Sequence, residues 1–229
     1  MIRALVFDFD GLIVDTERPV FEGWQSLYRS LGQELTEESW SGVIGHGGGW
    51  FDPFGELEQV VGRPLDREQL QRARRERELE LVREKPALPG VLDWVARAQA
   101  LGLGLGVASS SSLAWVTGHL ERLGITAFTC VRGRDSVSPG RTKPAPDLYL
   151  SAAACLGVAP GEALAIEDSG IGLQAAKAAG LRCVAVPGPL TLRHDFALAD
   201  LRLRSLAERS LDEVLEALAP TTTGGGPEH

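Results

Sequence analysis

Residues 3–11, RALVFDFDG, form a short apolar run that ends in two aspartates and a glycine. A run of this length with such an ending is typical of a buried strand that leads into a loop. Side chains alternate along a strand, so Asp8 and Asp10 face one side while Phe9 packs on the other. We therefore predict that the first strand delivers two carboxylates to one edge of a sheet.

From residue 85 onward, helical patterns alternate with short apolar strands. Strands are expected at LGLGVAS (103–109), FTCVRG (128–133), ALAIED (163–168) and RCVAVPG (182–188). Strands that alternate with helices predict a parallel sheet with helices on both faces. The predicted fold class is therefore α/β, with a doubly wound, Rossmann-like core.

One stretch interrupts this alternation because it contains only helical patterns. Helices are expected over residues 18–31 and over residues 66–84, the second opened by a capping-box pattern. We predict that residues 17–84 form a small helical cap domain inserted after the first strand. Residues 1–16 and 85–229 then form the α/β core domain.

The composition is that of an ordinary globular protein, with 44% hydrophobic and 24% charged residues. The formal net charge is −8, and the one basic cluster, RARRERELELVREK (72–85), is interleaved with glutamates, so we expect no nucleic-acid surface. No apolar run reaches the roughly 20 residues that cross a bilayer, and the N-terminus shows no targeting pattern. We expect a cytoplasmic protein without membrane contact, as a monomer or weak homodimer.

The three cysteines, Cys130, Cys155 and Cys183, are far apart and include no CxxC pair. This spacing is typical of buried or incidental thiols in a reducing compartment, rather than of a disulfide or a zinc site. The four histidines are scattered as well and do not indicate a histidine metal cluster.

Polar side chains gather where the predicted strands end. These residues are Asp8, Asp10, Ser109–Ser112, Glu167 and Asp168. In the sequence, Lys143 lies between the serines and Glu167, in a loop held by prolines, RTKPAPD (141–147). The carboxyl ends of the strands in an open parallel sheet line one crevice, so we expect these groups to converge. Ser111 or Ser112 is expected to serve only as a helix cap.

Such a set matches what phosphoryl transfer requires. A carboxylate can attack phosphorus and form an aspartyl-phosphate intermediate. Clustered carboxylates repel one another unless a cation lies among them, and oxygen ligands favour Mg²⁺. Lys143 and Ser109 would bind phosphate oxygens, and Asp10 would protonate the leaving group and later activate water. A small phosphorylated metabolite is therefore the expected partner.

Four segments carry a family resemblance: DFDGLIVDT (8–16), VASSSS (107–112), RTKPAPD (141–147) and AIEDSGIGLQAAKAAG (165–180). They resemble the four motifs of the haloacid dehalogenase (HAD) superfamily, in the family's order and spacing. The resemblance covers the whole predicted sheet domain, and it implies that the helical insertion is the family's small cap, which closes over the site and selects the substrate.

The resemblance also implies roles for individual residues. Asp8 would be the nucleophile, Asp10 the general acid/base, and Ser109 and Lys143 the phosphate ligands. Mg²⁺ would be held by Asp8, the backbone carbonyl of Asp10 and Asp168, with Glu167 as a ligand or through water. Asp15 and Thr16 would brace the loop. The further expected substrate contacts are Gly11, Ser110 and His46.

Within the superfamily, the chain is most similar to the beta-phosphoglucomutase-like branch, through GLIVDTE (11–17), KPAPD and EDS. Mutases of that branch usually carry a cap histidine a few residues after DT, where this chain has Val20. Their cap loop also carries an arginine, where this chain has the glycines of GHGGGW (45–50). The resemblance thus implies a phosphatase of sugar or nucleoside phosphates. A phosphosugar mutase stays the alternative, with His46 as its only candidate acid/base.

Two other functions stay open. A carbon–halogen hydrolase shares the fold and the nucleophilic aspartate but has no use for Asp10 and Asp168. A non-catalytic binding protein has no use for the full set of acids and Lys143. In the cap, GHGGGW is expected to face the substrate through His46 and Trp50, whereas the charged helix is expected to be mainly a solvated face.

Overall fold

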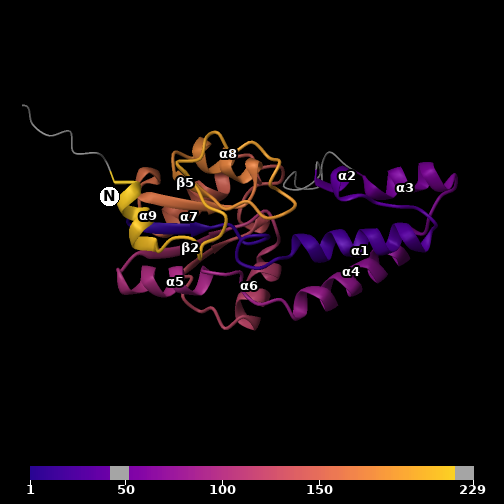
Figure 1. Cartoon of the computed structure of the whole chain (residues 1–229), viewed down its shortest axis with the longest axis horizontal. Helices are drawn as coiled ribbons and strands as arrows, with labels where there is room; N and C mark the ends of the chain where they lie inside the picture. Colours follow the sequence, from indigo (N-terminus) through magenta and orange to yellow (C-terminus); the bar gives the residue numbers. More distant parts are fainter. Residues whose placement is uncertain (42–51, 220–229) are drawn as a thin grey trace, which may run out of the picture.

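The computed structural model describes residues 1–41 and 52–219. The stretch GHGGGW, with His46 and Trp50, lies outside the described residues, so its expected contact with substrate stays a prediction. The chain forms a sheet flanked by helices, with a smaller group of helices on one side, at the right in Figure 1. Within the described ranges, no helix is both long and apolar enough to span a membrane.

Within the described residues, six parallel strands form one sheet in the order β3-β2-β1-β4-β5-β6. Their bounds are Ala4–Phe7 (β1), Gly104–Ala108 (β2), Cys130–Arg132 (β3), Ala163–Glu167 (β4), Arg182–Ala185 (β5) and Leu201–Arg202 (β6). β1 pairs with β2 on one side and β4 on the other, which places Phe7 next to Val107 and Ile166. The chain order reverses at β1, and this reversal opens a crevice at its carboxyl end.

Helices cover both faces of the sheet because successive side chains of β1 point to opposite faces. Leu5 and Phe7 pack in one apolar cluster with α5, α6 and α9, whereas Val6 packs in another with α7 and α8. The core helices are α5 (Val91–Ala100), α6 (Leu113–Arg122), α7 (Asp147–Cys155), α8 (Gly170–Ala178) and α9 (Leu211–Ala217), with short 3₁₀ turns η1 (Arg134–Ser136) and η2 (Pro160–Glu162). The predicted doubly wound α/β fold is confirmed.

In the described part of the chain, four helices lie between β1 and the linker that leads to α5 and β2. They are α1 (Glu17–Ser30), α2 (Glu37–Ser41), α3 (Pro53–Val61) and α4 (Arg67–Arg83), and we call them the helical lobe. α1 and α4 lie side by side (Figure 1). Gly23 of α1 lies against Arg74 of α4, where a Cβ would make ordinary van der Waals contact. Asp66 caps α4 by accepting from the amide of Gln69 at 3.0 Å, as the capping pattern predicts.

The helical lobe has an apolar core of its own. The rings of Trp24 and Phe54 meet edge to face with centroids 4.8 Å apart. The guanidinium of Arg74 lies 4.8 Å from the Trp24 ring centroid, so α4 is also held to α1 by a cation–π contact. The other buried members are Phe21, Leu27, Tyr28, Leu35, Trp40, Leu57 and Leu190, the last from the core.

Two short linkers join the helical lobe to the sheet and run next to each other. Val14 and Ala87 form an antiparallel bridge between them. Lys85 Nζ lies 3.4 Å from Asp15 Oδ2, which ties the two linkers together by an ion pair. Asp15 therefore braces the exit from β1, and the lobe begins directly beside the carboxyl end of that strand.

One prediction from the cysteine pattern is wrong. Cys130 of β3 and Cys155 of α7 are joined by a disulfide, with their Cα atoms 6.2 Å apart. The strand and the helix pack together although 25 positions separate the two cysteines, and sequence spacing alone does not reveal that contact. Cys183 is a buried free thiol, as predicted.

Candidate active site

The predicted strand-end residues meet at the carboxyl edge of the sheet. Asp8 follows β1, Ser109 follows β2 and Asp168 follows β4, and these three strands are neighbours. Lys143 arrives from the loop before α7. A pocket of about 530 Å³ is lined by all four side chains together with residues of the helical lobe. The structure thus brings together groups that lie up to 160 positions apart in the sequence.

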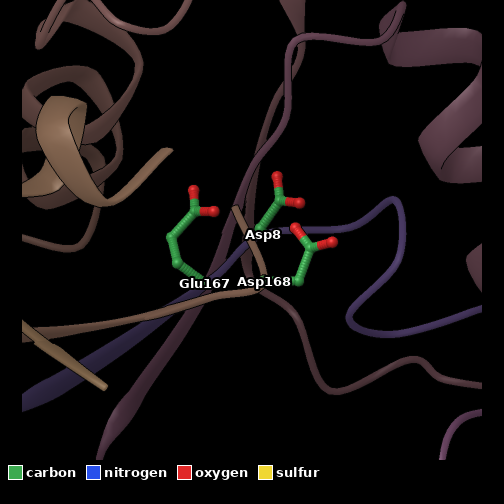
Figure 2. Close-up of side chains that lie close together, drawn as sticks. All are labelled: Asp8, Glu167 and Asp168. Atoms are coloured by element: carbon green, nitrogen blue, oxygen red, sulfur yellow. The ribbon is translucent and has the colours of Figure 1, made fainter. Parts of the chain in front are cut away.

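Three buried carboxylates, those of Asp8, Glu167 and Asp168, point into the same region (Figure 2). Each offers an oxygen within 4.8 Å of the others. Burial raises the pKa of Asp8 to about 7, with Glu167 and Asp10 adding to the rise and Lys143 opposing it. Burial also raises the pKa of Asp168 well above its usual range, assisted by the charges of Asp8 and Glu167. The cluster therefore holds more negative charge than it can stabilise alone.

Lys143 is the cation inside this cluster. Its Nζ lies 2.5 Å from Asp8 Oδ1 and 2.5 Å from Glu167 Oε1, and only 5% of its side chain is exposed. Burial by itself would lower the pKa of Lys143, but the charges of Asp8 and Glu167 raise it above its usual range. Lys143 therefore stays protonated and can offer positive charge to a phosphate.

Glu167 is fully buried and hydrogen-bonded to the helices behind the sheet edge. Tyr149 of α7 donates to its Oε1 at 2.5 Å, and Ser169 donates to its Oε2 at 3.2 Å. Gly172 of α8 leaves room for this carboxylate, since a Cβ there would collide with it. These contacts fix Glu167, which in turn orients Lys143.

Asp10 lies half-buried in the pocket wall and accepts four hydrogen bonds. Its Oδ1 accepts from Thr16 Oγ1 at 2.8 Å and from Trp115 Nε1 at 2.9 Å. Its Oδ2 accepts from Ser109 Oγ at 3.1 Å and from Ser111 Oγ at 2.7 Å. Donors on both oxygens hold the carboxylate in one orientation at the edge of the pocket.

The serines that follow Ser109 have separate roles. Ser112 caps α6, because its Oγ accepts from the amide of Trp115 at 3.3 Å. Ser111 instead donates to Asp10. Ser110 Oγ is buried in the pocket wall and has no hydrogen-bond partner among the residues that the structure describes. A buried hydroxyl of this kind is available to a ligand oxygen.

Gly11 makes the turn after β1. Its φ of +79° lies in the left-handed region, and a Cβ there would also collide with the carboxylate of Asp168. Gly11 lines a second, smaller cavity of about 310 Å³ rather than the pocket that holds Asp8 and Lys143. The positive φ and the close packing of Asp168 explain why this residue is a glycine. The expected contact of Gly11 with substrate stays a prediction.

The charged helix α4 supplies part of the pocket wall, although the sequence pattern favoured a solvated face. Arg74, Arg75 and Glu78 line the pocket from this helix. Arg74 pairs with Glu78 at 2.6 Å, whereas Arg75 is exposed and lines the pocket together with Arg134 of the core. Because charged residues occur all along this helix, no local sequence signal separates Arg74, Arg75 and Glu78 from a solvated face.

α1 forms the adjoining wall through Glu17 and Val20. Loss of hydration raises the pKa of Glu17 to about 8, and the charges of Asp10 and Asp8 add to the rise. Val20 presents an apolar side chain to the pocket. The lobe therefore contributes both charged and apolar groups above the acidic cluster.

Comparison with known proteins gives a consistent result. The family described as haloacid dehalogenase-like hydrolase matches residues 2–180. YhcW of Bacillus subtilis (strain 168), which is named as a phosphatase, is 44% identical over 219 residues, covering 95% of this chain and 98% of that protein. The similarity thus extends over both the sheet and the helical lobe.

Solved structures are similar over the same extent. CbbY from Rhodobacter sphaeroides was solved in complex with phosphate and, as a mutant, with xylulose-(1,5)bisphosphate. Each structure is 33% identical with a TM-score of 0.71 and covers 91% of this chain and 96% of its own. A Thermotoga maritima protein named as a beta-phosphoglucomutase is 25% identical with a TM-score of 0.76, over 95% of this chain and 100% of that one.

Proposed function

The chain belongs to the haloacid dehalogenase-like hydrolase family, and from that premise we propose that it is a Mg²⁺-dependent phosphatase of small phosphomonoesters, such as sugar or nucleoside phosphates. The observation that carries this proposal is the pocket in which Asp8, Lys143 and Asp168 meet. There a carboxylate can attack phosphorus while a lysine and a metal balance the charge. The phosphatase name of YhcW and the phosphate bound to CbbY support the same function.

The acidic cluster fits Mg²⁺. The donor atoms are oxygens, from the carboxylates of Asp8 and Asp168 and, we propose, the backbone carbonyl of Asp10. Hard oxygen donors favour Mg²⁺ over softer metals. Burial raises the pKa values of Asp8 and Asp168, neighbouring carboxylates add to the rise, and a divalent cation would lower both pKa values. When bound, Mg²⁺ offsets the repulsion between Asp8 and the incoming phosphate.

Glu167 completes the acidic set. Its oxygens already accept hydrogen bonds from Lys143, Tyr149 and Ser169. We therefore propose that Glu167 acts on the metal through its charge or through a water, and that its main task is to hold Lys143.

Asp8 performs the nucleophilic step. One of its carboxylate oxygens bonds to phosphorus as the bond from phosphorus to the leaving-group oxygen breaks. Asp10 gives its proton to that oxygen, so the alcohol leaves as a neutral molecule. Lys143, Ser109 and Ser110 hold the other phosphoryl oxygens.

The second step regenerates Asp8. Asp10, now ionised, takes a proton from a water molecule whose oxygen bonds to phosphorus. The bond between phosphorus and Asp8 breaks, and inorganic phosphate leaves. Because the same carboxylate gives a proton and then takes one, the orientation of Asp10 matters for both steps. The hydroxyl of Ser109 turns from Asp10 when it donates to a phosphoryl oxygen.

We propose that residues 17–84 act as a cap domain on a core domain of residues 1–16 and 85–229. The helical lobe supplies part of the wall of the pocket that holds Asp8 and Asp168, so its side chains are placed to select the substrate. Arg75 and Arg134 add positive charge at the pocket wall, which favours substrates that carry hydroxyl or further anionic groups beside the scissile phosphate.

A substrate panel tests the proposal directly. We expect the purified protein to release inorganic phosphate from members of a panel of sugar phosphates, sugar bisphosphates, nucleotides and phosphoglycolate with Mg²⁺, and not with EDTA. For a preferred substrate, kcat/KM should reach about 10⁴ M⁻¹ s⁻¹ or more. Failure on the whole panel would indicate a binding protein, and hydrolysis of 2-haloacids that survives EDTA would indicate a carbon–halogen hydrolase.

A phosphosugar mutase is the second candidate, favoured by the similarity to the Thermotoga maritima protein. A mutase needs a second acid/base group facing the substrate, and Val20 in the lobe wall cannot transfer a proton. His46 lies outside the described residues. Formation of glucose 6-phosphate from beta-glucose 1-phosphate without net phosphate release would favour the mutase.

The stabilisation of the protein by Mg²⁺ should increase between pH 5 and pH 8. Folded Asp8 keeps its proton up to about pH 7, whereas an unfolded aspartate loses it near pH 4. Between these values the folded state binds more protons, so the stability of the metal-free protein falls as the pH rises. Mg²⁺ requires the ionised carboxylates, so its stabilising effect grows over the same interval.

Thermal melting with saturating Mg²⁺ and with EDTA, at several pH values, measures this effect. The difference in Tm should widen by several degrees toward pH 8 and should be largely lost in Asp168→Asn. Asp93→Asn, an exposed change on α5, is the matched control and should behave as the wild type. A Mg²⁺ effect that does not depend on pH would contradict ligation by these buried acids.

A further inference from the structure

Trp115 connects α6 to the proposed general acid/base. It lies in the first turn of α6, lines the active-site pocket and donates from Nε1 to Asp10 Oδ1 at 2.9 Å. The other three donors to Asp10 are hydroxyl groups of Thr16, Ser109 and Ser111. Among the described residues that donate to Asp10, Trp115 is therefore the one that lies within a helix of the core.

An indole N–H differs from a hydroxyl because it can only donate. Ser109 and Ser111 can reverse their hydrogen bonds and accept from Asp10 Oδ2 when that oxygen carries a proton. A proton on Oδ1 would weaken the bond from Trp115, whereas a proton on Oδ2 leaves it intact. The donor-only partner therefore favours Oδ2 as the oxygen that carries the exchanged proton.

The indole is itself held in place along one face of α6. The rings of Trp115 and His119 meet edge to face with centroids 4.3 Å apart, and His119 is buried. Arg122 Nε donates to His119 Nδ1 at 3.2 Å. Arg122 Nη1 also donates to the carbonyl oxygens of Arg83 and Lys85, at 3.0 and 2.8 Å, where the chain leaves the helical lobe. A chain of contacts thus runs from this linker to the indole.

We propose that Trp115 is a positioning residue that sets the orientation of the Asp10 carboxylate for both proton transfers. This inference rests on the proposed role of Asp10 as general acid/base. Without the indole N–H, the one hydrogen bond left to Oδ1 from the residues that the structure describes comes from Thr16, at the start of the helical lobe. The carboxylate then samples more orientations, and proton transfer slows because it depends on close alignment with the reacting oxygen.

Trp115→Phe tests the proposal because it removes the N–H and keeps an aromatic ring. We expect single-turnover release of a sugar alcohol from its phosphate to slow by about 10- to 100-fold, with KM changed by less than about threefold. Release of p-nitrophenol from its phosphate should slow by less than about threefold, because this leaving group departs without a proton. The contrast between the two substrates separates lost proton transfer from lost folding.

Trp94→Phe is the matched control. Trp94 is buried in α5 and donates from Nε1 to the carbonyl oxygen of Arg209 at 3.0 Å, on the core side of the molecule. Its replacement also removes one indole hydrogen bond, and it should leave the rates for both substrates within about twofold of wild type.

A double-mutant cycle tests whether Trp115 acts through Asp10. In an Asp10→Asn background, Trp115→Phe should change the remaining rate by less than about twofold, because the group that it positions is already lost. An undiminished loss in that background, or equal losses for both leaving groups, would overturn the proposal.

The hydrogen bond can also be tested without any activity. The indole N–H signal of Trp115, assigned by its disappearance in Trp115→Phe, should shift upfield in Asp10→Asn while the other four tryptophan signals stay in place. If that signal does not move, the proposed contact is absent in solution and the inference fails. If the signal moves but the wild type hydrolyses no phosphate ester, the contact stands and the proposed function fails instead.

Discussion

Asp8→Asn should reduce phosphate release by about 10⁴-fold or more while the protein stays folded. The amide has the size of the carboxylate but cannot form the bond to phosphorus. Asp8 is 6% exposed and lies within 4.8 Å of the carboxylates of Glu167 and Asp168, so the neutral amide also relieves repulsion. We therefore expect the Tm of the metal-free variant at pH 8 to stay within a few degrees of wild type or to rise.

Steady-state phosphate release and thermal melting of the same preparation test both parts of this expectation. Asp93→Asn serves as the control, because it makes the same chemical change on the exposed side of α5. Mass spectrometry of the variant should exclude deamidation of the introduced asparagine to aspartate, which would restore activity. Turnover near the wild-type rate by a verified Asp8→Asn protein would remove Asp8 from the nucleophilic role.

The parts of the molecule that local patterns determine were predictable from the sequence. β1 follows from its apolar run, and the parallel sheet follows from the alternation of helices and strands. The convergence of Asp8, Ser109, Lys143 and Asp168 is a consequence of parallel strands sharing one carboxyl edge. Groups at such an edge can be located without knowing any side-chain contact.

Features that depend on packing between distant elements were not predictable in the same way. Arg74 and Arg75 look like solvated residues because their helix is charged all round, and only its packing on α1 turns them toward the pocket. The bond between Cys130 and Cys155 depends on how β3 meets α7. No local pattern indicates either arrangement.

Trp115 shows the same limit within the active site itself. Its position in a helix that follows a serine cap is readable from the sequence, and an apolar face would be the ordinary expectation for its ring. Its hydrogen bond to Asp10 requires the start of α6 to lie beside the loop after β1. This placement follows from the pairing of β1 with β2, which is a tertiary fact.

Lys143→Met should destabilise the metal-free protein and nearly abolish activity. The side chain is 5% exposed and lies 2.5 Å from both Asp8 and Glu167, so its removal leaves buried carboxylates without their cation. Breaking a buried ion pair in this way costs about 3–5 kcal/mol. For a chain of this size the Tm should fall by roughly 6–20 °C. Loss of the charge on the phosphoryl oxygens should lower kcat/KM by about 10³-fold.

Two dependences separate this electrostatic effect from a general packing defect. The pKa values of Asp8 and Asp168 are raised even with Lys143 present. At pH 5 these acids are therefore largely protonated, and the variant carries less unbalanced charge. The loss of stability should thus be smaller at pH 5 than at pH 8. Saturating Mg²⁺ should raise the Tm of the variant more than that of the wild type, since the ion supplies the missing positive charge. A packing defect would respond to neither condition.

Lys177→Met is the matched control for this substitution. Lys177 pairs with Asp200 at 2.7 Å, but its side chain is 28% exposed, so the pair contributes at most about 1 kcal/mol. Its Tm should therefore change by no more than about 4 °C, without a larger response to Mg²⁺. If Lys143→Met melts like Lys177→Met at pH 8 in EDTA, then Lys143 does not neutralise the buried acids. The charge balance on which the proposed attack by Asp8 depends would then have to be supplied by another group.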